Sequence, residues 1–354
     1  MNTRPVVYAL LSALLFGLST PAAKALVGLA DPALLAGLLY CGAGLGAAVF
    51  RRVARSISSA SSAGGATEAA LGRADLPWLA GAILAGGIVG PLLLMFGLTR
   101  TEAGTASLML TLEGVATALM AWFIFHENFD RRIALGMTCL VAGALVLSWS
   151  GQPTLSSLVG PVAIVGACIA WGLDNNLTRK VSLADPLQIV ELKGLIAGPC
   201  NIVLGWWMGG ALPGTGAIAL AGLVGMLGYG ASLALFVLAL RHLGTARTGA
   251  YFSTAPFFGA AAAVLALGEP LTSQLLVAAG LMAIGVWLHI TEHHEHFHVH
   301  DPIAHDHAHT HDEHHQHEHG PLDPLGEPHT HPHRHAPLAH AHHHMPDEHH
   351  RHRH

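Results

Sequence analysis

The C-terminal part of the chain carries most of its potential metal ligands. All but three of the 28 histidines lie beyond Thr291, and the three exceptions are His126, His242 and His289. The segment from His294 to His319 aligns without a gap on the segment from His329 to His354, at an offset of 35 residues. Because both copies keep an alternating H-x-H frame, the spacing itself is predicted to matter.

Alternating imidazoles indicate transition-metal chemistry. Neutral imidazole suits Zn²⁺, Ni²⁺, Co²⁺ and Cu²⁺, and H-x-H spacing lets neighbouring rings converge on one ion when the chain wraps around it. Binding would weaken as the pH falls below about 6.5, the pKa of free imidazole. No other cofactor is required. The predicted ligands are His296, His298, His300, His305, His307, His309, His314, His315, His331, His333, His335, His340, His342, His344, His349 and His350.

The tail, residues 292–354, has too few apolar residues to build a core, and it is predicted to be disordered without a ligand. The alternative to metal binding is a solubilising, pH-responsive tail. The duplicated spacing argues against that alternative, because a solubilising tail needs no register.

A second group of candidates consists of polar side chains inside long apolar runs. An ionisable group at bilayer depth is costly unless it is paired or hydrated, so each one is a candidate functional residue. Glu113 is the best placed, because it could bind a cation or exchange a proton; the alternative is a structural partner for Lys24 or Lys193. The other candidates for the transport pathway are Asp174, Asn175, Asn176, Ser19, Thr20 and Lys193.

Geometry limits what these residues can do together. Asp174, Asn175 and Asn176 are consecutive, so on a helix they spread over roughly 300° and cannot all face one cavity. Ser19 and Thr20 occupy the matching positions in the first half of the chain, where the following Pro21 predicts a hinge or an opened turn. Lys193 either contributes to the pathway or extends to the membrane interface. Glu269 is expected to be interfacial and structural.

The elements that must position these side chains are membrane-spanning helices. Hydrophobic residues make up 52% of the chain and charged residues 11%, and the mean hydropathy is +0.47, unlike an ordinary soluble domain. Apolar runs of about 20 residues, the length of a transmembrane helix, recur along the body. The spans predict an all-α polytopic membrane protein with ten helices, at 6–26, 32–50, 76–98, 103–125, 132–150, 156–178, 186–208, 217–240, 245–267 and 271–290.

The basic residues predict an orientation in the bilayer. With the N-terminus in the cytoplasm, arginines and lysines such as Arg51, Arg131 and Arg179 gather in the inner connections, and Arg100 alone lies outside. An even number of crossings then places the histidine tail in the cytoplasm too. The expected location is a bacterial inner membrane. The first span also resembles a signal peptide followed by PAAKA, but the repeat described next requires it as a helix.

The body contains an internal repeat. FGLSTPAAK with LADP (Phe16 to Pro32) matches WGLDNNLTRK with LADP (Trp171 to Pro186). Each copy contains an odd number of predicted helices, so the second copy enters the membrane from the opposite side, as in many secondary transporters. The predicted units are an inverted pair of five-helix repeats, 1–150 and 151–291, followed by the tail, 292–354.

These motifs resemble the EamA-type family of the drug/metabolite transporter superfamily. The resemblance rests on the aromatic-Gly motif of the first helix in each half, on the Gly-Thr-Ala opening of the fourth and ninth helices, and on LTLEGV and STAPFF. LTLEGV departs from the family's L-x-E-P element at Gly114, and STAPFF departs from it at Ala255. The resemblance covers roughly 6–290. It implies alternating access and a central cavity lined mainly by the first, third and fourth helices of each half.

Two functions remain open from the sequence. In the first, the chain is a secondary transporter of a divalent transition metal (Ni, Co or Zn), with the tail collecting ions at the cytoplasmic mouth. In the second, it exports a small organic metabolite or amino acid, with the tail as metal sensor or buffer. A third hypothesis, a metal store that the helices only anchor to the membrane, is disfavoured because an anchor needs one helix and no inverted repeat. The sequence shows no phosphate-binding loop, catalytic triad or basic nucleic-acid patch, so neither enzyme activity nor a nucleic-acid partner is expected. The partners are the lipid bilayer and the cargo, and a homodimer is left open.

Overall fold

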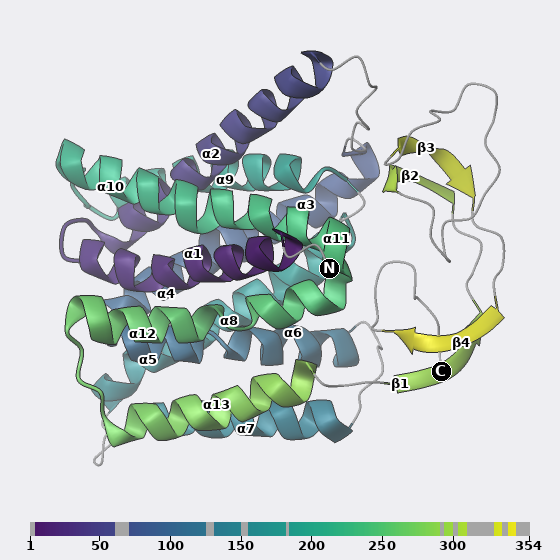
Figure 1. The fold of residues 1–354 in the computed structure, drawn as a ribbon. Helices are drawn as coiled ribbons and strands as arrows, with labels where there is room; N and C mark the ends of the chain where they lie inside the picture. Colours follow the sequence, from purple (N-terminus) through teal and green to yellow (C-terminus); the bar gives the residue numbers. More distant parts are fainter. Residues whose placement is uncertain are drawn as a thin grey trace.

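The computed structural model is a bundle of helices followed by short strands in the tail (Figure 1). It describes residues 4–60, 71–124, 131–149, 155–181, 184–290, 294–299, 304–309, 329–334 and 339–344. The helices of the first half are α1 (Arg4–Leu26), α2 (Pro32–Ala60), η1 (Arg73–Asp75), α3 (Leu76–Ala82), η2 (Ile83–Val89), α4 (Gly90–Leu98), α5 (Ala103–Met109), α6 (Leu112–Phe123) and α7 (Arg131–Ser148). Those of the second half are α8 (Leu155–Arg179), α9 (Pro186–Trp207), α10 (Thr215–Gly225), η3 (Met226–Ala231), α11 (Ser232–Phe252), α12 (Ala255–Leu267) and α13 (Ser273–Ile290).

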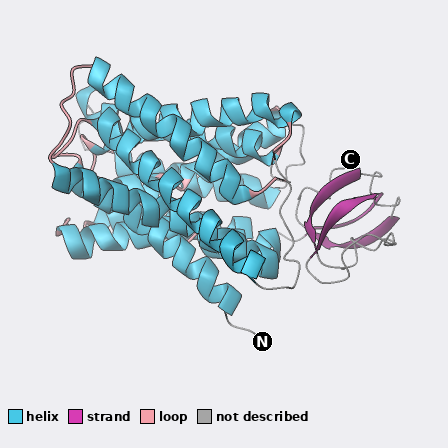
Figure 2. Cartoon of the chain, turned by 90° about the horizontal axis from the view of Figure 1, so that it is seen from above, coloured by secondary structure: helices cyan, strands magenta, loops and turns pink. Residues whose placement is uncertain are grey.

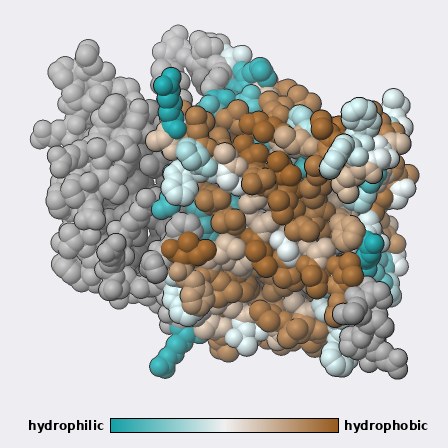
Figure 3. Space-filling model, turned by 180° about the vertical axis from the view of Figure 1, so that it is seen from behind, coloured by the Kyte–Doolittle hydropathy of each residue, from teal (hydrophilic) through white to brown (hydrophobic). Residues whose placement is uncertain are grey.

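The bundle has the dimensions and surface of a membrane protein. Within the described residues, eight helical segments are long and apolar enough to cross a bilayer, and two shorter apolar helices, Ala255–Leu267 and Ser273–Leu288, follow them. Figure 3 shows a broad hydrophobic face with hydrophilic residues at its margins. Exposed tryptophans lie near the helix ends, as expected at a membrane–water interface: Trp149 and Trp207 at one end of the bundle, Trp78 and Trp122 at the other. The start of α1 and the end of α13 lie at the same end (Figure 1).

Two predicted helix boundaries and one predicted hinge differ from the structure. The second helix was predicted to stop at 50, but α2 continues to Ala60 because hydropathy detects the apolar core of a helix and not its solvated extension. The connection predicted at 241–244 is helical, since α11 runs to Phe252. The hinge or opened turn predicted at Pro21 is absent from the described backbone, because α1 is helical on both sides of it.

The duplicated LADP sequence begins the second helix of each half. The Oδ1 atom of Asp31 accepts a hydrogen bond from the backbone N–H of Ala33 at 2.9 Å. The Oδ1 atom of Asp185 accepts one from the N–H of Leu187, also at 2.9 Å. The proline that follows each aspartate occupies the first position of its helix, where no backbone N–H is needed.

Helices α2 and α9 cross at glycines. A Cβ atom built on Gly194 would lie 2.4 Å from the backbone nitrogen of Gly44 and 2.5 Å from its Cα. Lipid offers no hydrophobic drive for helix association, so close backbone packing between small residues must supply it. The two halves of the chain are therefore joined by a backbone contact that tolerates no side chain.

Replacing Gly194 with Ala is expected to destabilise the protein by about 1–3 kcal/mol, because the new methyl group overlaps backbone atoms that cannot move alone. Unfolding in detergent, followed by helix content, measures the change. Gly280→Ala is the matched control, since a Cβ there meets nothing within 4 Å. Equal stability of the two variants would contradict the close crossing.

The tail differs from its predicted disorder. Its described parts are four six-residue strands, β1 (His294–Val299), β2 (Ala304–His309), β3 (His329–Arg334) and β4 (Ala339–His344). Figure 2 shows them as strands beyond one end of the helices. Strand β1 pairs antiparallel with β4, and β2 pairs antiparallel with β3. The alternation that spaces the imidazoles is also the two-residue period of a β-strand, so the described chain is not entirely α-helical.

Candidate functional site

Two helices are interrupted at matching places in the two halves. Helix α5 ends at Met109 and α6 begins at Leu112, while α11 ends at Phe252 and α12 begins at Ala255. A threonine hydroxyl closes each break in the same way. The Oγ1 atom of Thr111 donates to the carbonyl of Leu108 at 2.8 Å, and that of Thr254 donates to the carbonyl of Tyr251 at 2.6 Å. Interrupted helices of this kind form the substrate sites of many transporters.

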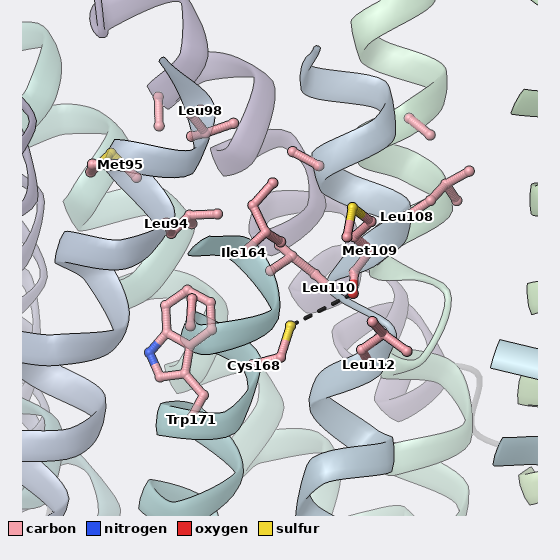
Figure 4. Close-up of a cluster of buried hydrophobic side chains, with 14 of the residues drawn as sticks. Leu94, Met95, Leu98, Leu108, Met109, Leu110, Leu112, Ile164, Cys168 and Trp171 are labelled. Atoms are coloured by element: carbon pink, nitrogen blue, oxygen red, sulfur yellow. Dashed lines mark hydrogen bonds between the residues drawn. The ribbon is translucent and has the colours of Figure 1, made fainter. Parts of the chain in front are cut away.

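A buried apolar cluster supports the break between α5 and α6 (Figure 4). Leu108 and Met109 come from α5, and Ile164 and Cys168 come from α8. The thiol of Cys168 donates to the carbonyl of Met109, with 3.6 Å between sulfur and oxygen. That carbonyl lies at the end of α5, so the buried cysteine supplies a donor where the regular helix stops.

A cavity of about 200 Å³ lies between the two interrupted helices. It is lined by residues of the first, fourth and fifth membrane segments of the first half and of the fourth and fifth segments of the second half: Phe16, Gly17, Thr20, Ser107, Leu110, Thr111, Glu113, Gly114, Leu140, Phe252, Ser253, Ala255, Pro256 and Val286. The family resemblance implied the first, third and fourth helices of each half. This cavity lacks residues of the third helices, so the implied lining is wrong for it.

Glu113 is the acidic residue of this cavity. It lies in the first turn of α6, and its Oε1 atom accepts a hydrogen bond from the side-chain amide of Asn175 at 2.8 Å. Asn175 also donates to the hydroxyl of Thr117 at 3.2 Å. The predicted alternative, a structural pairing of Glu113 with Lys24 or Lys193, is not observed. Lys24 donates instead to the carbonyls of Leu98 and Thr101, at 2.5 and 2.7 Å.

Asp174 and Lys193 form a separate buried ion pair. The Nζ atom of Lys193 lies 2.6 Å from both carboxylate oxygens of Asp174, and the two side chains are 15% and 9% exposed. Asn176 faces another way and donates to the carbonyls of Gly172 and Thr117. The three consecutive polar residues of α8 therefore do not act on one site: Asp174 pairs with Lys193 and Asn175 with Glu113, although Asn175 and Asn176 both also bond to Thr117, one to its hydroxyl and the other to its carbonyl.

The third membrane segment of each half contains a π-helical stretch, η2 in the first half and η3 in the second. In η2, the carbonyl of Gly86 accepts hydrogen bonds from the hydroxyl of Tyr40 at 2.6 Å and the indole of Trp171 at 2.9 Å. The amide of Asn201 donates to the carbonyl of Gly87 at 3.0 Å. A π-turn leaves carbonyls without their usual helical partners, and these side chains satisfy them. Sequence reasoning did not single out Tyr40 or Asn201.

The aromatic-Gly motif has equivalent contacts in its two copies. A Cβ on Gly17 would meet the carbonyl of Ala255 at 2.2 Å, at the start of α12, and a Cβ on Gly172 would meet Ala116 of α6 at 2.9 Å. Each motif glycine thus lets its helix pack against the interrupted helix of the other half. Two residues further on, Ser19 packs against Gly228 of η3, and Asp174 packs against Gly86 of η2.

The structure brings only some of the predicted pathway residues together. Glu113 and Thr20 line the cavity, and Asn175 reaches it through Glu113. Ser19 is buried, and its hydroxyl donates to the carbonyl of Phe16. Asp174, Asn176 and Lys193 are absent from the lining. Of the lining residues that sequence reasoning missed, several lie in or beside its repeated motifs, among them Phe16, Ser107, Phe252, Ser253 and Pro256, whereas Leu140 and Val286 do not.

The predicted metal ligands lie in the tail, partly on its described strands. Ten of them are on the described strands: His296, His298, His305, His307, His309, His331, His333, His340, His342 and His344. The other six lie outside the described residues: His300, His314, His315, His335, His349 and His350. Among the residues whose side chains the structure describes, which do not include those of the tail strands, no group of three or more histidine, cysteine, aspartate or glutamate side chains is arranged to hold a metal ion. Glu269, expected to be structural, caps α5: its carboxylate accepts hydrogen bonds from the N–H groups of Ala103 at 2.5 Å and Gly104 at 2.7 Å.

Comparison with known proteins adds three kinds of finding. The model of the EamA-like transporter family matches residues 3–149 and again 158–291. A protein of Methanothermobacter thermautotrophicus, described as an uncharacterized transporter, is 27% identical over 284 residues, which cover 77% of this chain and 82% of that protein. A Salmonella typhimurium protein named "probable amino-acid metabolite efflux pump" is 27% identical over 207 residues, which cover 53% of this chain and 67% of the relative.

Two further similarities are narrower. The Pseudomonas aeruginosa protein named as a probable flippase subunit, ArnE, for 4-amino-4-deoxy-L-arabinose-phosphoundecaprenol is 42% identical over 78 residues, or 22% of this chain and 65% of that protein. A solved crystal structure shares the fold, with a TM-score of 0.57 at 17% sequence identity, and the match covers 82% of this chain and 97% of the other.

Proposed function

Because the chain belongs to the EamA-like transporter family, we propose that it is a secondary transporter that exports a small organic metabolite of the amino-acid type. The family consists of transporters and not of enzymes. The sequence has no phosphate-binding loop, and an ion gradient is proposed to supply the energy. The two halves are proposed to face opposite ways in the membrane and to alternate access to a cavity between them.

The observation that carries the proposal is the cavity between the two interrupted helices, with the carboxylate of Glu113 in its wall. A carboxylate binds the ammonium group of an amino acid. Ser253 and the start of α12 also line the cavity, and the positive end of the helix dipole suits the substrate carboxylate. Phe16, Leu110 and Phe252 supply an apolar wall for a side chain. The volume, about 200 Å³, is below the roughly 300–1,000 Å³ typical of drug-sized sites.

This cavity favours an organic cargo over a metal ion. Glu113 is the single ionisable residue among the lining residues, all of which the structure describes, and none of them is a histidine or cysteine. Transition-metal sites are usually built from several such ligands. The name of the Salmonella typhimurium relative also supports an amino-acid metabolite and the outward direction.

Transport by the purified full-length protein in sealed vesicles tests the proposal. Amino acids with apolar, cationic and acidic side chains are compared with Ni²⁺, Co²⁺ and Zn²⁺, each with and without an imposed pH gradient. We expect saturable exchange of at least one amino acid with an apolar side chain. Uptake of a metal ion without exchange of any amino acid would overturn the assignment of cargo.

A further inference from the structure

The strands of the tail pair in a specific register. In the first ribbon, the Cα partners of β1 and β4 include His294 with His344, His296 with His342, and His298 with His340. In the second ribbon, β2 and β3 pair His305 with His333, His307 with His331, and His309 with His329. Every histidine of β1 and every histidine of β2 is therefore directly opposite another histidine.

The register also combines the two sequence copies. At the offset of 35 residues, β3 is the copy of β1 and β4 is the copy of β2. Strand β1 of the first copy consequently pairs with the second copy's equivalent of β2, and β2 pairs with the second copy's equivalent of β1. The two ribbons are equivalent by sequence, although one is formed by the outer strands of the tail and the other by the inner strands.

Strand geometry gathers these histidines on one face. Residues two apart along a strand share a face, and directly opposed residues in an antiparallel pair share it too, with Cα atoms about 4.5–5.5 Å apart. Each ribbon thus has three opposed histidine pairs on one face. Successive pairs are about 7 Å apart along the strand. Two neighbouring pairs therefore place four histidines next to one another on the same face of the ribbon.

We propose that each tail ribbon is a divalent transition-metal site built from opposed histidines of both sequence copies. Four imidazoles form a nitrogen-ligand set suited to Zn²⁺, Ni²⁺ or Cu²⁺. In the observed register the partner strands of β1 and β2 both come from the second copy, so each site requires both copies. The two sites are independent of the membrane cavity, so the proposal does not rest on the identity of the cargo.

A register-shift variant separates this site from general binding to a histidine-rich chain. Combining Ala339→His, His340→Ala, Ala341→His and His342→Ala keeps the number of histidines but moves two of the three paired ones to the opposite face of β4. Zn²⁺ is titrated into the purified, untagged full-length protein in competition with a chromogenic chelator. The wild type should bind about two ions tightly, and the variant about one, because one ribbon keeps only the His294–His344 pair and so loses its set of four opposed histidines.

The control variant, Phe297→Ala with Thr330→Ala, changes both ribbons at positions without histidine and should keep both sites. Unchanged helix content shows that the membrane bundle remains folded in every variant. Cu²⁺ spectra should show four nitrogen ligands in the wild type and a loss of half the signal in the register-shift variant. Equal stoichiometry and equal spectra in the two proteins would overturn the paired-strand site and would indicate binding without register.

Discussion

Replacing Glu113 with Gln is expected to lower transport by roughly 100-fold, equivalent to about 2.8 kcal/mol of interaction with the substrate. The substitution keeps the shape of the side chain and its capacity to accept the hydrogen bond from Asn175. It removes the negative charge, which is the cavity's only counterpart for a substrate ammonium group among the lining residues. Initial rates in proteoliposomes measure the effect, and the same preparation shows whether the protein inserts normally.

Glu102→Gln is the matched control for this experiment. Glu102 precedes α5, its side chain makes no capping hydrogen bond, and it is exposed and absent from the cavity lining. The same loss of charge there should leave transport within about twofold of the wild type, as for a surface substitution. Full activity of the Glu113 variant would instead make that carboxylate a packing residue held by Asn175.

Replacing Lys193 with Met is expected to destabilise the protein by roughly 3–5 kcal/mol, because Asp174 would remain charged and buried without its partner. The two side chains are 15% and 9% exposed, and both carboxylate oxygens lie 2.6 Å from the ammonium nitrogen. The hydroxyl of Thr178 alone would then donate to the Asp174 carboxylate, at 2.8 Å. Thermal unfolding in detergent measures the loss.

The double variant Lys193→Met with Asp174→Asn tests the cause. Removing both charges should recover most of the stability, because no uncompensated charge remains. Lys24→Met is the control, since Lys24 bonds to two carbonyl oxygens and its loss leaves no buried charge unpaired. Additive effects of the two single substitutions would show that Lys193 and Asp174 do not stabilise the fold as a pair.

The membrane class and the repeat were predictable from the sequence because both depend on local patterns. Apolar runs of bilayer length need no knowledge of their neighbours, and the LADP and aromatic-Gly motifs repeat in recognisable order. The breaks in the fourth and ninth predicted helices, between α5 and α6 and between α11 and α12, were harder to predict from the sequence. LTLEGV and STAPFF marked their places, but the backbone interruption itself depends on Thr111 and Thr254 bonding to carbonyls one turn back.

The partners of the polar residues were decided by the tertiary structure. The sequence placed Glu113, Asp174 and Lys193 at membrane depth but left open which would pair. The pairing of Glu113 depends on the packing of α8 against α6, which brings Asn175 to Glu113. The position of Asp174 depends on Gly86 of η2, which has no side chain to overlap the Asp174 carboxylate. Similarly, the alternation of histidines in the tail indicated metal chemistry, whereas their opposition across two ribbons required the strand register.

The sequence by itself determined that this is a repeated, membrane-embedded chain of transporter type, because solvent preference and motif order are properties of single segments. The cavity, the ion pair beside it and the pairing of the tail strands were decided only by the tertiary structure. These features arise where residues distant in sequence approach within a few ångströms, and small residues such as Gly17, Gly86 and Gly172 set how closely they approach.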